Sequence, residues 1–380
     1  MKSIPAFFAA AIAVILVILA IAFFAPLPVP YFQDFSVMYF TDKALLNGIP
    51  IYAYPAQLIF IKTLTPPDFT FHPYPYPPWY ALSTLYLGWL PVEVAARAWF
   101  LLNLAMLSLT VWLLTPGWQG PRRILGVLAA VLFVPAFGLL VVGQYSAPVL
   151  LGAALFVYAA RKNKPFWSAA ALLLMTFKPH IGGLLFLAGF SWLILERSDF
   201  AKRALALAII GGVLLAGSGF LADPAWPLTY LQSLARYRDI PGVQTCGLCA
   251  SLSVVLVSVT TGQGNTAAAT WVSLGLALLA GGLLFTRFRA CLKDPTILIS
   301  IFAVLTLLID PYLLNYDYIL LLLPLFWLVR QRVWLAWVVY FVPWAALALG
   351  RNGNILLALA GLVTFILILQ NSGPPIPARD

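Results

Sequence analysis

Long runs of hydrophobic residues alternate with short polar segments along most of the chain. A helix needs roughly 20 apolar residues to cross a hydrocarbon core about 30 Å thick, and its backbone groups must pair within the segment. The pattern therefore predicts an all-α polytopic membrane protein with about 12 transmembrane helices. The predicted spans lie at about 5–27, 97–116, 123–142, 145–160, 165–179, 180–196, 203–222, 266–287, 294–311, 313–329, 332–349 and 353–371.

Composition agrees with this pattern. Hydrophobic residues make up 63% of the chain and charged residues 9%, and the mean hydropathy is +0.96. Soluble domains carry about 25% charged residues, so the chain is expected to be a single integral-membrane domain over residues 1–380, in a cell membrane (inner or plasma membrane). The first apolar run is longer than the core of a signal peptide, which favours a retained membrane anchor.

The net charge of +10 is explained by membrane topology. If the basic loops are cytoplasmic, 15 of the 22 Lys and Arg residues lie on one side, as the positive-inside rule requires. Both termini are then cytoplasmic, and nucleic acid is excluded as a partner. The basic residues on that side are Lys2, Arg122, Arg123, Arg161, Lys162, Lys164, Arg197, Lys202, Arg203, Arg287, Arg289, Lys293, Arg330, Arg332 and Arg379.

The predicted number of spans depends on the segment Pro78–Leu90. It is short and bounded by prolines, and if it crossed the membrane every later basic cluster would change sides. We therefore expect it to lie at the interface, within a long first extracytoplasmic loop (about 28–96) that carries short interfacial helices. A second long external loop is expected at about 223–265.

This topology places nearly every non-basic ionisable group outside the cytoplasmic loops at the opposite face. Ionisable residues near membrane depth are costly and are functional candidates by default. The candidates at this face are Asp34, His72, Lys178, His180, Asp310 and Asp317. Together they predict an active site that opens to the extracytoplasmic space.

A series of short motifs resembles glycosyltransferase family 87, over about residues 30–325. The motifs are Asp34-Phe35, Lys43-Ala44-Leu45-Leu46-Asn47-Gly48, Tyr52, Tyr76-Pro77-Pro78, Trp99, Asn103, Gly143-Gln144, Lys178-Pro179 and Tyr316-Asp317. The resemblance implies a GT-C-like bundle that takes a sugar from a polyprenyl-phosphate donor. One departure is that Leu313-Leu314-Asn315 stands where a histidine is expected before the Tyr-Asp pair.

The resemblance implies transfer of a hexose, with mannose as the first choice, to a hydroxyl of a glycolipid or polysaccharide acceptor. Such a reaction needs a base for the hydroxyl proton and donors for the departing phosphate. Asp34 is the candidate catalytic base from its place in the first external loop. The alternative role for Asp34 is to cap a helix over 36–46.

Each remaining candidate also has a structural alternative. We expect Lys178, His180, Arg236 and Arg238 to bind the donor phosphate, although interfacial snorkelling also explains such residues. Sugar or acceptor contacts are expected from His72, Tyr74, Tyr76, Gln144, Asn315 and Asp317. An aromatic belt, a turn or a helix cap are the corresponding structural alternatives.

No cofactor or metal is expected, because the chain lacks a phosphate-binding loop, a dinucleotide fingerprint and a zinc-protease motif. Cys246 and Cys249 stand in an external loop, where an oxidising space permits a disulfide. Two other classes fit the same topology. One is a transporter or flippase of lipid-linked sugars, and the other is a polymerase or ligase of surface polysaccharide.

Overall fold

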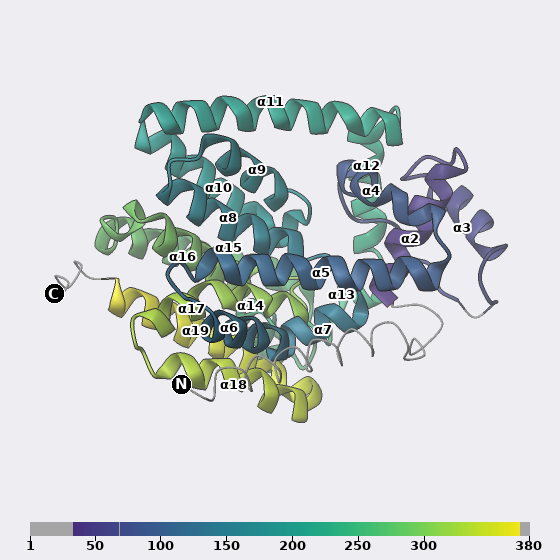
Figure 1. Ribbon diagram of the computed structural model, residues 1–380. Helices are drawn as coiled ribbons and strands as arrows, with labels where there is room; N and C mark the ends of the chain where they lie inside the picture. The colour runs from purple at the N-terminus through teal and green to yellow at the C-terminus, as the bar shows by residue number, and fades with distance from the viewer. Residues whose placement is uncertain (1–32, 68, 373–380) are drawn as a thin grey trace, which may run out of the picture.

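The computed structural model describes residues 33–67 and 69–372 as a helical bundle (Figure 1). No β-strand occurs in this part of the chain, so the prediction of an all-α protein is confirmed there. The α-helices are α2 (Gln33–Leu46), α3 (Tyr54–Lys62), α4 (Pro78–Thr84), α5 (Val92–Leu114), α6 (Pro121–Leu132), α7 (Val134–Val142), α8 (Ala147–Arg161), α9 (Pro165–Met175), α10 (Pro179–Glu196), α11 (Asp199–Ala222), α12 (Trp226–Arg238), α13 (Pro241–Gln244), α14 (Leu252–Thr261), α15 (Thr266–Arg287), α16 (Pro295–Ile309), α17 (Leu322–Arg330), α18 (Leu335–Ala348) and α19 (Asn354–Asn371). Four short 3₁₀ helices are η1 (Leu85–Trp89), η2 (Cys291–Lys293), η3 (Asn315–Leu321) and η4 (Gly350–Gly353).

The prediction of about twelve spans is not confirmed. Five of the described helices are long and apolar enough to cross a membrane, namely α5, α10, α11, α15 and the η4–α19 segment, and a sixth span results if α6 and α7 count as one. Several other predicted spans are shorter helices. At 1.5 Å per residue the 11 residues of α9 extend about 16 Å, roughly half of a hydrocarbon core. The predicted first span, 5–27, lies outside the described residues.

The predicted span at 123–142 is two helices, α6 and α7, that meet at an angle of 65°. Phe133 between them has an extended backbone, with φ −67° and ψ 120°. Pro135 follows two residues later and has no backbone N–H to donate to a helical carbonyl, which breaks the ladder at this point. The apolar run is continuous in the sequence, but the proline divides it into two helices that are bent relative to each other.

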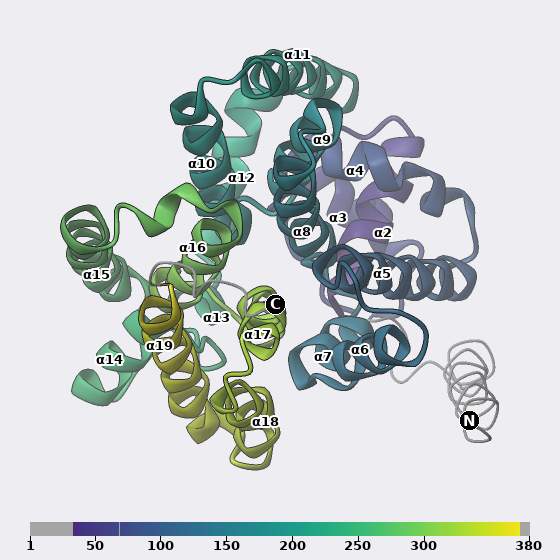
Figure 2. The ribbon, with the colours of Figure 1, turned by 60° about the vertical axis from the view of Figure 1, so that its left-hand side comes forward.

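The bundle is organised around α8, which is buried along almost its whole length. It packs against α5, α9, α10 and α16, as Figure 2 shows in a view roughly along these helices. A Cβ atom at Gly152 would lie 2.8 Å from the carbonyl oxygen of Ala171, so the glycine permits the close approach of α8 and α9. Small residues at helix interfaces serve this purpose in membrane bundles.

A second, aromatic core fills one end of the bundle. The helices α2, α3, α4 and α12 gather there, at the right-hand end of α5 and α11 in Figure 1. The core consists of buried side chains from these helices and their connections, including Phe35, Tyr52, Tyr74 and Tyr80. It holds α2 in place, and α2 carries Asp34 in its first turn.

Asp42, two turns after Asp34, is completely buried in this aromatic end. Burial raises the pKa of its carboxyl well above the usual range, and the neighbouring Thr84 hydroxyl lowers this pKa by less. Among the described residues, no side chain or backbone group meets hydrogen-bond geometry to either Asp42 oxygen. A neutral carboxylic acid is therefore the form that the fold favours.

Replacing Asp42 by asparagine is expected to raise the thermal midpoint at neutral pH. An unfolded aspartate ionises near pH 4. The folded state keeps its proton to higher pH, so it loses stability as the pH rises above that value, at about 1.4 kcal/mol per pKa unit. Thermal unfolding in detergent between about pH 4 and pH 7 checks this. A gain that does not shrink toward pH 4 would contradict a protonated Asp42.

Candidate active site

Four turns, far apart in the sequence, meet at the aromatic end of the bundle. They are the first turn of α2 with Asp34, the α7–α8 turn with Gln144 and Ser146, the α9–α10 turn with Lys178, and η3 with Asp317. Hydrogen bonds connect all five side chains in one network. We call these five residues the Asp34 cluster.

Asp34 is the member of the cluster that stays partly exposed. Its Oδ2 accepts a hydrogen bond of 3.1 Å from Nε2 of Gln144, and its backbone carbonyl accepts one from the hydroxyl of Tyr145. The same hydroxyl accepts a bond from the Met38 backbone N–H, 3.1 Å away. Tyr145 therefore ties the first turn of α2 to the α7–α8 turn, and Asp34 remains partly exposed as a residue.

The electrostatics of Asp34 suit a base. Burial raises the pKa of its carboxyl, whereas the positive charge of Lys178 and the hydrogen bond from Gln144 lower it by less. A carboxylate with a raised pKa accepts a proton more readily than a solvated one. A negative charge in the first turn also suits the dipole of α2.

Lys178 is buried, with 2% of its side chain exposed, which excludes a snorkelling lysine. Its Nζ donates to Oδ1 of Asp317 at 2.6 Å, to Oγ of Ser146 at 2.9 Å and to Oε1 of Gln144 at 3.2 Å. It also lies 5.1 Å from the centre of the Tyr316 ring. All three protons of the ammonium group thus have partners inside the protein.

The local sequence explains how Lys178 is presented. Pro179 begins α10 directly after it, so Lys178 takes the N-cap position with a non-helical backbone. A Cβ atom at Gly182 would overlap the carbonyl oxygen of Met175, which ends α9. The glycine thereby allows α9 and α10 to approach closely, and the short connection between them turns Lys178 inward.

Asp317 is the anionic partner, with 1% of its side chain exposed. Besides Lys178, its Oδ1 accepts a bond of 2.5 Å from the Ser146 hydroxyl, and its Oδ2 accepts one of 3.4 Å from the Leu314 N–H. Sequence reasoning missed Ser146. Its position just before the apolar run of α8, with Pro148 at the second helical position, was the signal available.

Tyrosines surround the cluster. The Tyr76 ring packs edge-on against Tyr145, with 4.9 Å between centroids. On the other side, the hydroxyls of Tyr237 and Tyr312 lie 3.0 Å apart, and the Tyr312 ring packs edge-on against His180 at 6.4 Å. His180 is exposed. Tyr74 and Tyr76 are 1% and 7% exposed, and both belong to the aromatic core.

The other candidates from the sequence lie apart from this network. His72, Arg236, Arg238 and Asn315 are all exposed, and among the described residues no hydrogen bond or ion pair joins them to the Asp34 cluster. Arg238 instead lies 3.6 Å from Asp239. Arg236 and Arg238 flank Tyr237 in the sequence of α12.

Asp310 accepts a bond of 2.9 Å from the Tyr312 N–H, which closes a turn. Among residues 33–67 and 69–372, no group of three or more His, Cys, Asp or Glu side chains is arranged to hold a metal ion.

The fold and the cluster define a helical membrane protein with a partly exposed carboxylate beside a buried ion pair. Within that class, the model of glycosyltransferase family 87 matches residues 74–311, more than half of the chain. The chain therefore belongs to glycosyltransferase family 87, as its motifs indicate, and is a glycosyltransferase. The matched segment includes Gln144 and Lys178, whereas Asp34 and Asp317 lie outside it. Searches of curated proteins and of solved structures gave no significant match.

Proposed function

We propose that this glycosyltransferase moves a hexose, most simply mannose, from a polyprenyl-phosphate donor to a hydroxyl of a glycolipid or polysaccharide acceptor. The observation that carries the proposal is the partly exposed Asp34 carboxylate, held by Gln144 next to the buried Lys178–Asp317 pair. A carboxylate that is fixed in place and still accessible is what proton abstraction from a hydroxyl requires.

The proposed step is a displacement at the anomeric carbon of the sugar. The acceptor oxygen forms the new glycosidic bond as its proton passes to the Asp34 carboxylate. The bond between the anomeric carbon and the phosphate oxygen breaks, and the polyprenyl phosphate leaves with the electron pair. Asp34 then returns its proton to water, which restores the ionised base.

In this scheme Lys178 does not touch the substrates and acts through its neighbours. Its ammonium group is fully engaged by Asp317, Ser146 and Gln144, so we assign it the positioning of Gln144 and the electrostatic support of ionised Asp34. Its contact with the donor phosphate, expected from the sequence, would require it to exchange partners. This assignment makes Lys178 a positioning residue.

Exposed groups are better suited to the donor phosphate. His180 lies at the N-terminus of α10 and contacts Tyr312, and the exposed Arg236 and Arg238 flank Tyr237, which is hydrogen-bonded to Tyr312. Guanidinium groups recognise phosphate by bidentate hydrogen bonds. We assign the phosphate to this side of the cluster, and the sugar and acceptor to the side of Gln144 and Tyr76. His72 and Asn315 lie apart from the cluster and are assigned no contact.

The proposed side of the membrane is extracytoplasmic, with both termini cytoplasmic. Ser146 precedes the N-terminus of α8, whereas Arg161 ends the helix and pairs with Asp294 at 2.9 Å. Lys178 precedes α10, and Arg197 follows its far end. The cluster and the basic loops therefore stand at opposite ends of the same helices, as the positive-inside rule requires for an external site.

Purified protein in lipid vesicles, supplied with labelled polyprenyl-phosphate mannose and a glycolipid acceptor, should form labelled product and polyprenyl phosphate in equal amounts. A nucleotide sugar should not replace the donor, which is the control for donor class. The same assay with polyprenyl-phosphate glucose or arabinose tests the sugar. Labelled lipid that crosses the vesicle membrane without transfer would overturn the proposal in favour of a flippase.

A further inference from the structure

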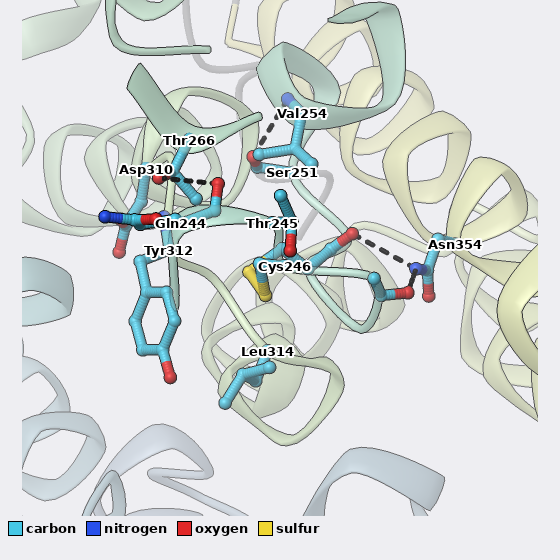
Figure 3. Close-up of a disulfide and its surroundings, with 12 residues drawn as sticks. Gln244, Thr245, Cys246, Ser251, Val254, Thr266, Asp310, Tyr312, Leu314 and Asn354 are labelled. Carbon is cyan, nitrogen blue, oxygen red and sulfur yellow. Dashed lines mark hydrogen bonds between the residues drawn. A yellow bond between two sulfur atoms is a disulfide. The ribbon is translucent and has the colours of Figure 1, made fainter. Parts of the chain in front are cut away.

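A disulfide lies next to the turn that carries Asp317. Cys246 and Cys249 are bonded to each other, with 4% and 2% of the residues exposed, in the connection between α13 and α14. Figure 3 shows the disulfide with Leu314 and Asn354 on different sides of it. The bond closes the loop Cys246-Gly247-Leu248-Cys249, in which the two cysteines are buried and Leu248 is exposed.

The end of this loop pairs with the segment before η3. Cys249 and Leu314 form an antiparallel bridge, and the Ala250 N–H donates to the Leu313 carbonyl at 2.9 Å. The hydroxyl of Tyr318, a completely buried residue of η3, donates to the Ala250 carbonyl at 2.7 Å. Cys249 and Ala250 therefore hold the backbone at Leu313 and Leu314 and the side chain of Tyr318.

The disulfide loop is itself anchored from its other side. Nδ2 of Asn354, the first residue of α19, donates to the carbonyl of Cys249 at 3.1 Å and to that of Gly247 at 3.3 Å. Both carbonyls belong to the short loop that the disulfide closes. The loop is thus held by α19 on one side and by the segment before η3 on the other.

Leu314 connects the disulfide loop to the Lys178–Asp317 ion pair. Its N–H donates to Oδ2 of Asp317 at 3.4 Å, and its carbonyl accepts the Asp317 N–H at 3.0 Å. Asp317 is therefore held on both its backbone and its carboxylate by the residue that pairs with Cys249. Its Oδ1 is the atom that binds Lys178 and Ser146.

We propose that the Cys246–Cys249 disulfide is a positioning element for catalysis, which holds the Leu313–Leu314 backbone so that Asp317 orients Lys178 and Gln144 beside Asp34. A loop this short restricts the unfolded chain less than a long one does. Loss of the bond therefore acts mainly on the local geometry of η3. The effect on turnover rests on the proposed function, whereas the effect on η3 does not.

The test compares Cys246→Ala/Cys249→Ala with Cys291→Ala, which removes the free cysteine. Amide hydrogen exchange at residues 313–317 should become faster in the double variant and stay at the wild-type rate in the control. With an active donor, kcat should fall by about tenfold to a hundredfold, because small displacements of catalytic groups have effects of this size. The KM for the donor should remain close to that of the wild type.

Tyr318→Phe provides a second variant that keeps the disulfide and removes the hydroxyl bound to Ala250. It should shift exchange and kcat in the same direction by a smaller factor. Wild-type exchange at 313–317 in the double cysteine variant would overturn the inference. So would a double variant that fails to fold while Tyr318→Phe behaves as wild type. Faster exchange with no transfer in any protein, wild type included, would overturn the proposed function and leave the positioning of η3 standing.

Discussion

Asp34→Asn is expected to reduce sugar transfer by about a hundredfold to ten-thousandfold, the range that a general base contributes. The amide keeps the size of the carboxylate and can still meet Gln144, but it cannot accept the acceptor proton. Lys178 keeps its ion pair with Asp317, so the change leaves no buried charge without a partner. The fold, measured by its thermal midpoint in detergent, should therefore remain intact while kcat falls.

Asp42→Asn is the matched control for this experiment. It makes the same chemical change on the same helix, two turns away, at a carboxyl that is buried in the aromatic core. It should keep wild-type transfer. If Asp34→Asn retains wild-type turnover, Asp34 is not the base; if both variants lose activity equally, α2 has been disturbed and neither carboxyl can be assigned.

The pH dependence of the wild-type enzyme offers a further check on Asp34 within the same experiment. The base must be ionised to act, and burial raises the pKa of its carboxyl above the usual range. Activity should therefore decline as the pH falls through that raised value. The residual activity of Asp34→Asn should lack this acid limb.

Removing one partner of the Lys178–Asp317 pair should have the largest effect on stability. Both side chains are almost completely buried and lie 2.6 Å apart. Loss of one partner of a buried ion pair leaves an uncompensated charge and costs about 3–5 kcal/mol. Lys178→Met and Asp317→Leu, made singly, should each lower the thermal midpoint strongly.

The double variant, Lys178→Met with Asp317→Leu, should recover much of the stability that either single change loses, because no buried charge then remains. Sugar transfer should stay low, since Gln144 and Asp34 lose the ammonium group beside them. Lys202→Ala is the surface control: its ammonium group lies 3.6 Å from Asp199 with both side chains well exposed. It should leave the midpoint unchanged. Additive losses in the double variant would contradict a coupled ion pair.

Much of the fold class was predictable from hydrophobic patterning, but the number of spans was not. Apolar composition predicts burial in lipid, but it does not determine the residue at which a helix ends. Pro135 breaks one predicted span, and the shortness of α9 shows that another apolar run does not form a full-length helix. Breaks of this kind depend on individual backbone positions.

The candidate site shows the same division. Asp34, Gln144, Lys178 and Asp317 were predicted to lie at one face, and the described structure brings them into contact. Ser146 was missed, because a serine before an apolar run is indistinguishable from an ordinary helix cap. Tyr74 was predicted to contact the sugar or acceptor, but its side chain is buried in the aromatic core. The sequence around a tyrosine does not show whether its ring faces a binding site or the core.

The sequence by itself determined the class of protein and its family. A chain with so few charges must place its backbone in helices within lipid, and ordered short motifs identify glycosyltransferase family 87. Only the tertiary structure decided that Lys178 is fully paired inside the protein and that Asp34 stays partly exposed. Pairing and exposure depend on contacts between turns that are between 32 and 171 residues apart, and no local pattern in the chain encodes them.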